Sequence, residues 1–207
     1  MRVVLVGALL ALTACGGENA ALIPPPPAAP PDSPVVFVGD SITASWPLPA
    51  RYVNAGIGGN TSEQMLKRFG KDVIPHLPGT VAILAGTNDV LFVAKPTIEH
   101  VREMAEAASA AGACTILATI PPIEHWETWT PYAKTYGDAL IAQWNDSIVA
   151  LSKARGYFLA DYHRALSVDG AQITDYFTDG VHLNEAGYQK LWQVVLPQLH
   201  SCGAPTG

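Results

Sequence analysis

The sequence predicts a doubly wound α/β domain, in which helices cover both faces of a parallel sheet. Short apolar runs recur along the chain, and they are continuous instead of alternating with polar residues. Continuous runs are typical of strands that are buried on both faces. Helical patterns with one apolar stripe separate these runs, and the links between them are short. With 207 residues, 49% of them hydrophobic, the chain is long enough for one domain with a substantial core.

Five segments have the composition of buried strands. They are residues 35–38, 52–55, 81–85, 115–120 and 157–160. All parallel strands end at the same edge of a sheet, and active sites in such sheets lie at that edge. We therefore expect the chemistry of this chain in the loops that follow these strands.

Four segments between and after the strands have apolar residues at helical spacing. They are residues 61–74, 97–111, 138–154 and 185–199. Gly112 and Gly156 are placed to end the second and third helices, and Asn184 is a candidate N-cap of the last one. The aromatic residues of these segments are expected in the core.

The first residues predict a lipoprotein signal peptide at 1–14. An apolar run of ten residues, 3–12, follows Arg2, and it is too short to span a bilayer, which takes about 20 residues. The run ends in Leu12-Thr13-Ala14-Cys15, which resembles the lipobox of bacterial lipoproteins and implies a lipid on Cys15. This predicts a lipid-anchored protein of the bacterial cell envelope, facing the periplasm or the exterior. A plain secretory signal with an incidental Cys15 is the main alternative, and a buried N-terminal strand is a weaker one.

Residues 15–34 are predicted to form a proline-rich tether between the anchor and a folded domain at 35–202, with a tail at 203–207. Seven prolines between 24 and 34 fix the backbone in extended conformations and remove hydrogen-bond donors. In an exported protein Cys114 and Cys202 are candidates for a disulfide bond, and two free buried thiols are the alternative.

The charge and the motifs argue against several kinds of partner. The formal net charge is −6 and no run of Lys or Arg occurs, so a nucleic-acid partner is not expected. Five scattered histidines lack metal-ligand spacing, and they are His76, His100, His125, His163 and His200. Neither a phosphate-binding loop nor a complete dinucleotide motif is present. We expect no metal and no cofactor, and the oligomeric state is not predicted.

Two of the loops carry the residue types of nucleophilic catalysis. Ser41 follows the first strand, and a serine hydroxyl becomes a nucleophile only when a base takes its proton. His182 supplies such a base in a later loop, and Asp179 lies three residues before it. Gly180 makes the turn easy, so the carboxylate can hold Nδ1 of the imidazole while Nε2 faces outward.

Two further loops supply hydrogen-bond donors for an oxyanion. Gly59 offers a backbone N–H that no side chain shields, and Asn88 offers its amide. The N–H of Ser41, at the expected start of a helix, is the third donor. A set of helix caps and turns without catalytic function is the alternative explanation of all these residues.

Taken together, the four blocks resemble the SGNH (GDSL-type) hydrolase superfamily over roughly residues 35 to 200. The blocks are Gly39-Asp40-Ser41, Gly59 within residues 54–62, Gly86-x-Asn88-Asp89 and Asp179-x-x-His182. The resemblance implies a three-layer α/β/α, flavodoxin-like fold with a five-stranded parallel sheet and no metal. It also implies that Ser41 is the nucleophile, His182 the base and Asp179 its orienting group, with Ser41, Gly59 and Asn88 as the oxyanion hole.

The leading hypothesis is therefore a serine esterase that forms an acyl-Ser41 intermediate on a small ester or on an acylated glycan or lipid. An acyltransferase or O-acetylesterase acting on cell-envelope glycan, and a non-catalytic carbohydrate-binding lipoprotein, are the alternatives. Four aromatic residues are candidates for substrate binding, with a place in or over the core as the alternative. They are Trp46, Trp126, Trp129 and Tyr132.

Overall fold

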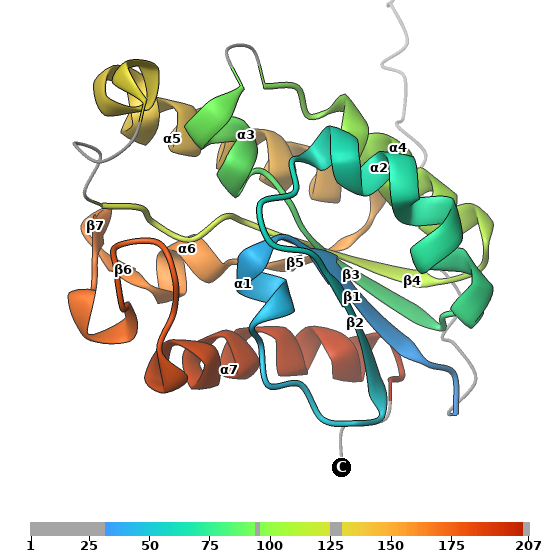
Figure 1. Ribbon diagram of the computed structural model, residues 1–207. Coiled ribbons are helices and arrows are strands. Elements are labelled where there is room, and N and C mark those ends of the chain that lie inside the picture. The colour runs from blue at the N-terminus through green and yellow to red at the C-terminus, as the bar shows by residue number, and fades with distance from the viewer. Residues whose placement is uncertain (1–31, 94–95, 125–129, 205–207) are drawn as a thin grey trace, which may run out of the picture.

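The computed structural model describes residues 32–93, 96–124 and 130–204. It has three layers, with a five-stranded sheet between two layers of helices (Figure 1), which confirms the predicted fold class. The strand order is β2-β1-β3-β4-β5, and all neighbouring strands are parallel. The strands are β1 (Val35–Gly39), β2 (Tyr52–Gly56), β3 (Thr80–Leu84), β4 (Cys114–Ala118) and β5 (Phe158–Ala160).

The helices divide between the two faces of the sheet (Figure 1). One face is covered by α2 (Ser62–Asp72), α3 (Thr87–Phe92), α4 (Glu99–Ala110) and α5 (Pro131–Arg155). The other face carries α1 (Ser41–Ala44), α6 (Tyr162–Ala165) and α7 (Glu185–Ser201). A two-stranded hairpin of β6 (Ser167–Val168) and β7 (Ala171–Gln172) follows α6, and short 3₁₀ turns lie at Ile74–His76 and Thr174–Tyr176.

The register brings the carboxyl ends of the strands into line. Gly39 at the end of β1 pairs with Gly56 of β2 and with Leu84 of β3. Leu84 in turn pairs with Ala118, the last residue of β4. The loops that carry the predicted site therefore begin at one edge of the sheet, as expected for this architecture.

Strands β1, β3 and β4 are buried along their whole length, as their continuous apolar sequences predict. Val36, Val81 and Ile116 have no exposed surface. Burying a side chain of this kind contributes about 1.5–3 kcal/mol, so the three central strands hold the sheet edge in place.

Helix α5 begins earlier than the sequence predicted, at Pro131 instead of residue 138. The Thr130 hydroxyl accepts a hydrogen bond from the N–H of Ala133, and Pro131 occupies the first turn, where its missing N–H costs nothing. Tyr132, one of the aromatic candidates, therefore lies in a helix. The sequence also did not predict the short helices α3 and α6 or the β6–β7 hairpin, because each is too short to show periodicity.

A disulfide bond joins Cys114, the first residue of β4, to Cys202, the C-cap of α7. Of the two states that the sequence left open, the structure has the bonded one. Cys114 opens its strand, so the bond lies at the edge opposite the predicted site. It closes a sequence separation of 88 residues, and the chain-entropy model gives such a loop a stabilisation of about 4–5 kcal/mol.

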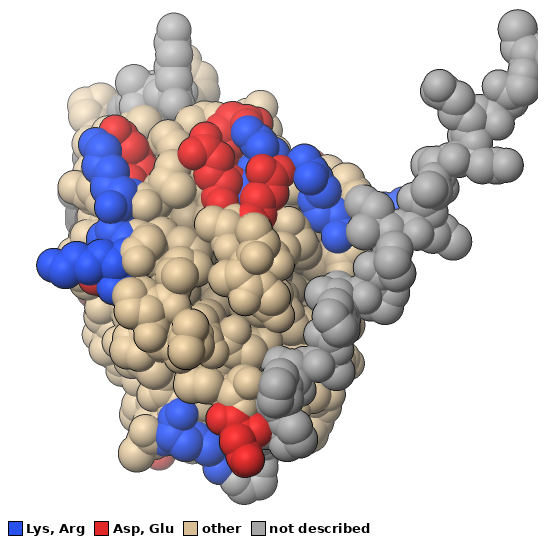
Figure 2. Space-filling view, turned by 90° about the vertical axis from the view of Figure 1, so that its right-hand side faces the viewer, with Lys and Arg blue, Asp and Glu red and all other residues tan. Residues whose placement is uncertain are grey.

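The face toward the amino ends of the strands has charges of both signs (Figure 2). Lys and Arg lie next to Asp and Glu, and uncharged residues fill a broad area between the charged groups. This face therefore has no continuous basic patch of the kind that nucleic acid needs.

No helix within residues 32–93, 96–124 and 130–204 is both long and apolar enough to cross a membrane. The predicted signal peptide 1–14, nearly all of the tether 15–34 with Cys15, and residues 205–207 of the tail lie outside the described residues.

Candidate active site

The first strand ends in a tight turn that presents Ser41. A side chain at Gly39 would collide with Thr43 and with the carbonyl oxygen of Leu84, so only glycine fits there. Asp40 caps the one-turn helix α1, because its carboxylate accepts the N–H of Ile42 at 2.9 Å. Helix α1 has only four residues, so the helix dipole expected at Ser41 is weaker than the sequence suggested.

The structure brings Ser41 and His182 together across a sequence separation of 141 residues. Ser41 Oγ lies 3.0 Å from His182 Nε2. On the other side of the imidazole ring, His182 Nδ1 lies 2.7 Å from Asp179 Oδ2. Histidine thus lies between serine and carboxylate, which is the order that lets it take a proton from the hydroxyl while the carboxylate holds the ring.

A short turn fixes Asp179 against His182. Oδ1 of Asp179 accepts the backbone N–H groups of Val181 at 3.0 Å and of His182 at 2.8 Å. Gly180 has φ of +82°, which favours glycine and closes the turn. Burial alone would raise the pKa of Asp179, but the hydrogen bonds from the His182 ring and from the two N–H groups outweigh it and lower the pKa. The carboxylate is therefore ionised when it holds the imidazole.

Gln172, the last residue of β7, is hydrogen-bonded to this turn. Its Nε2 donates to the carbonyl oxygen of Gly180 at 2.8 Å and to that of Pro122 at 2.9 Å. The N–H of Glu124 also donates to Gly180 O at 2.9 Å. Gln172 was not predicted as a site residue, since a single glutamine in a two-residue strand has no sequence signal.

The predicted oxyanion donors are connected through the loop that follows β2. Gly59 has φ of +76°, and a side chain placed at the adjacent Gly58 would lie 3.9 Å from Cβ of Ser41, so this loop passes beside the serine. Asn88 Nδ2 donates to the carbonyl oxygen of Asn60 at 3.0 Å. An amide group has two N–H bonds, and this contact uses one of them.

Arg68 of α2 fastens the same loop to the end of β1. Its Nε donates to Asn60 Oδ1 at 2.7 Å, and its Nη2 donates to Gly39 O at 3.0 Å. Asp72 pairs with the same guanidinium at 3.3 Å. Arg68 was not predicted as a site residue, although its position three residues after the apolar Met65 places it on the inward side of the helix.

A second group of Ser, His and Asp lies nearby but is arranged differently. The buried Ser62 hydroxyl donates to Asp89 Oδ1 and lies 3.0 Å from His100 Nδ1. Here serine, not histidine, lies between the other two, and the backbone N–H of Ser62 also donates to Asp89. Burial raises the pKa of Asp89, against the lowering effect of the Ser62 bonds. This group joins the start of α2 to α3 next to Asn88, which is a structural role.

Asp40 itself is fully buried next to Ser41 in the chain. Its Oδ2 and the hydroxyl of Thr87 are buried, and in the described part of the chain neither makes a hydrogen bond of standard geometry. Burial raises the pKa of Asp40 to about 6, although the Ile42 N–H, Thr87 and His182 each lower it.

The aromatic candidates have different outcomes. Trp46 is 6% exposed and packs against Phe37 and against Tyr188 and Trp192 of α7, with ring centroids 5.4–6.3 Å apart. Of the two alternatives for Trp46, substrate binding or a place in the core, the structure has the second. Tyr132 lies in the first turn of α5, and its side chain is not described. Trp126 and Trp129 lie outside the described residues.

Among residues 32–93, 96–124 and 130–204 no group of three His, Cys, Asp or Glu side chains is placed to hold a metal ion.

Residues 37–190 match the family described as GDSL-like Lipase/Acylhydrolase. A search of curated proteins gave no match. Among solved structures, the chain is similar to a GDSL-like lipase from Bacteroides thetaiotaomicron, with 32% identity, coverage of 89% of this chain and 94% of that chain, and a TM-score of 0.72. A Bacteroides fragilis protein assigned as an acylhydrolase has 28% identity, 88% and 93% coverage, and a TM-score of 0.73.

A catalytic mutant of an acetylxylan esterase from Geobacillus stearothermophilus shares the fold, with 20% identity, 82% and 94% coverage, and a TM-score of 0.64.

Proposed function

We propose that this chain, which belongs to the GDSL-like lipase/acylhydrolase family and is a serine hydrolase, cleaves carboxylic esters through an acyl-Ser41 intermediate. The observation that carries this proposal is the hydrogen-bonded series from Ser41 through His182 to Asp179. No other group of described residues on this sheet edge has a serine and a carboxylate on opposite nitrogens of one imidazole.

In the first half-reaction Ser41 Oγ attacks the carbonyl carbon of the ester while His182 Nε2 takes the hydroxyl proton. The carbonyl oxygen gains negative charge and is met by the N–H groups of Ser41 and Gly59 and by the Asn88 amide. One such donor contributes about 10²–10³ in rate. His182 then gives its proton to the leaving alcohol oxygen as the C–O bond breaks, which leaves the acyl group on Ser41.

In the second half-reaction water takes the place of the alcohol. His182 accepts a proton from the water as its oxygen attacks the acyl carbon, and returns it to Ser41 Oγ as the acyl group leaves. The side chains of His182 and Asp179 are 41% and 55% exposed, so water reaches the base. This exposure supports hydrolysis over transfer to another alcohol, which requires that water be excluded.

The decisive variant is Ser41→Ala, assayed with short p-nitrophenyl esters. It should lose essentially all activity above background, because the variant removes the hydroxyl that is hydrogen-bonded to the His182 imidazole, whereas the Thr178 hydroxyl bonds to the backbone carbonyl of His182. Ser45→Ala is the matched control, since Ser45 is exposed and lies on the next turn after Ser41. Full activity of the Ser41→Ala protein with a native thermal transition would overturn the mechanism.

We also propose that the mature protein is held at the bacterial cell envelope by a lipid on Cys15. The support is the sequence alone: an apolar run of signal-peptide length, the Leu-Thr-Ala-Cys motif and the proline-rich segment after it. Intact-mass analysis of the protein from membranes should give a chain that begins at a lipidated Cys15. A mature chain that begins after residue 15 would contradict the anchor and leave the esterase proposal untouched.

A further inference from the structure

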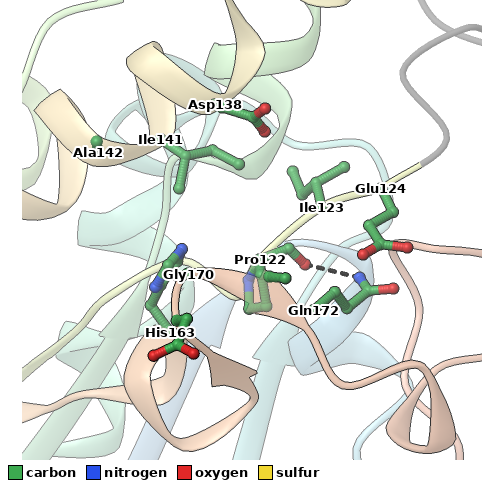
Figure 3. A pocket seen from close by; sticks show the side chains of 11 residues that line it. Pro122, Ile123, Glu124, Asp138, Ile141, Ala142, His163, Gly170 and Gln172 are labelled. Carbon is green, nitrogen blue, oxygen red and sulfur yellow. Dashed lines mark hydrogen bonds between the residues drawn. The ribbon is translucent and has the colours of Figure 1, made fainter.

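A cavity that contains none of the catalytic residues lies at the edge of the sheet formed by the carboxyl ends of the strands (Figure 3). Its volume is about 620 Å³, within the range of roughly 300–1,000 Å³ that is usual for small-molecule sites. The walls come from α5, from residues 122–124 after β4, from His163 after β5 and from the turn between β6 and β7. None of Ser41, Asp179 and His182 lines it, so it is separate from the reacting atoms.

The lining of this cavity is apolar at its base and polar at its rim. Pro122, Ile123 and Ile141 are buried and form an aliphatic surface. Glu124 and Asp169 bring carboxylates to the more exposed positions, and Figure 3 shows Asp138 on the α5 side. Among the described residues that line the cavity none is Lys or Arg. Anionic ligands are therefore disfavoured. An acyl chain would displace water from the carboxylates without offering them hydrogen bonds, so it is disfavoured as well.

The polar groups also do not converge on one point. Within the described chain no three His, Cys, Asp or Glu side chains are close enough to share a metal ion. Burial lowers the pKa of His163, against the opposite effect of Asp161, so this imidazole is neutral near pH 7 and both donates and accepts hydrogen bonds. Dispersed acceptors above an aliphatic base suit an extended ligand with hydroxyl donors on its edges and C–H groups on its faces, which is the chemistry of a neutral saccharide.

One wall of the cavity is bonded directly to the catalytic turn. Gln172 and the Glu124 N–H both hold the carbonyl oxygen of Gly180, and both residues line the cavity. Gly180 is two residues from His182, a separation of at most about 7 Å along the chain. The cavity wall therefore lies on the order of 10 Å from the imidazole, a distance that one short oligosaccharide spans.

We propose that this cavity binds the saccharide part of an acylated glycan whose ester group is cleaved at Ser41. The inference rests on the proposed esterase activity and adds a substrate class to it. The cavity recognises the alcohol side of the ester, while the groups around Ser41 act on its acyl side.

The experiment compares two kinds of ester on the same variants. Chemically O-acetylated neutral oligosaccharides of glucose, xylose and N-acetylglucosamine carry a saccharide, and p-nitrophenyl acetate does not. Ala142→Trp places an indole from the exposed face of α5 into the cavity, and Ala139→Trp is the matched control on the same helix outside the lining. Asp169→Asn is a second variant, because asparagine tolerates the positive φ of +51° at this position while it removes one charged acceptor.

Wild type should hydrolyse at least one of the acetylated oligosaccharides with a higher kcat/KM than p-nitrophenyl acetate. Ala142→Trp should lower kcat/KM for that oligosaccharide about tenfold more than for p-nitrophenyl acetate, mainly through KM, and Asp169→Asn should show the same bias at about threefold. Ala139→Trp should change neither substrate.

Equal losses on both substrates in the Ala142→Trp protein, or no oligosaccharide preferred by wild type, would overturn the saccharide site. Inhibition by the organic cation spermidine that Ala142→Trp relieves would overturn it in favour of a cation site. If the esterase proposal itself fails, p-nitrophenyl acetate is turned over equally by wild type and Ser41→Ala, so the two failures are distinct.

Discussion

Replacing Asp40 by Asn should stabilise the protein at neutral pH and have no such effect in acid. The side chain is fully buried, and its pKa rises from an ordinary value of 3.8 to about 6 in the fold. At a pH between these two values, Asp40 is therefore protonated in the folded state and ionised in the unfolded state. The favourable contribution is complete below pH 3.8 and is lost as the pH rises through 6, where the folded protein must bury a charge.

The expected size follows from the difference between the two pKa values. Each pKa unit corresponds to 1.36 kcal/mol, so the buried charge costs about 3 kcal/mol above pH 6. Asparagine is neutral at every pH, keeps an oxygen that can cap the Ile42 N–H, and has an N–H group that can donate to the Thr87 hydroxyl beside it. For a domain of this size about 3 kcal/mol corresponds to a Tm increase of roughly 6–12 °C.

The assay is guanidinium-induced unfolding of wild type and Asp40→Asn at several pH values from 4 to 8. The difference between their free energies of unfolding is compared at each pH, so titrations common to both proteins cancel. It should be small at pH 4, grow as the pH rises through about 6, and then level off. Asp146→Asn is the control, because Asp146 is an exposed carboxylate on α5 and its replacement should give no such trend. A difference that does not vary with pH, or that falls as the pH rises, would refute the reasoning.

The other predictions concern the turn, the oxyanion donors and the disulfide bond. Asp179→Asn should lower kcat by about three to four orders of magnitude, because asparagine holds the wrong tautomer of His182; a loss under tenfold would contradict this. Asn88→Ala should lower kcat by about 10²–10³ with KM nearly constant, whereas a change in KM alone would indicate a binding role. Gln172→Leu should lower kcat about tenfold on p-nitrophenyl acetate because Gly180 loses one of its bonds; a lower Tm with unchanged kcat would make its role purely structural. Replacing Cys114 and Cys202 together by Ser should lower the free energy of unfolding by about 4–5 kcal/mol without changing kcat at 25 °C, and an unchanged denaturation midpoint would contradict the bond.

The sheet and the catalytic edge could be predicted from the sequence because their signals are local. The strand segments are largely apolar runs, and a glycine follows each of the first three, at Gly39, Gly56 and Gly86. Parallel pairing then places Ser41 and Asn88, which follow the first and third strands, at one edge, and His182 was assigned to the same site by its residue type and by the family resemblance of the Asp179-x-x-His182 block.

The residues that hold the site in place could not be found in this way. Gln172 reaches Gly180, and Arg68 reaches Gly39, through contacts that depend on how the layers pack. A lone polar residue in a short strand or an amphipathic helix has no pattern that separates it from a solvent-exposed one. Trp46 was assigned to substrate binding but lies in the core. From the sequence alone, an aromatic residue shortly after Ser41 is equally compatible with a pocket wall and with the core.

The central claim is that an ester leaves its acyl group on Ser41. The most direct measurement is rapid-quench intact-mass spectrometry of the protein mixed with p-nitrophenyl butyrate, followed by peptide mapping. The account predicts a transient adduct of one butyryl group on the peptide that contains Ser41, absent in Ser41→Ala and trapped more fully in Asn88→Ala if deacylation is the step most slowed. An adduct on another residue, such as Ser62 or Ser45, with turnover intact would contradict it.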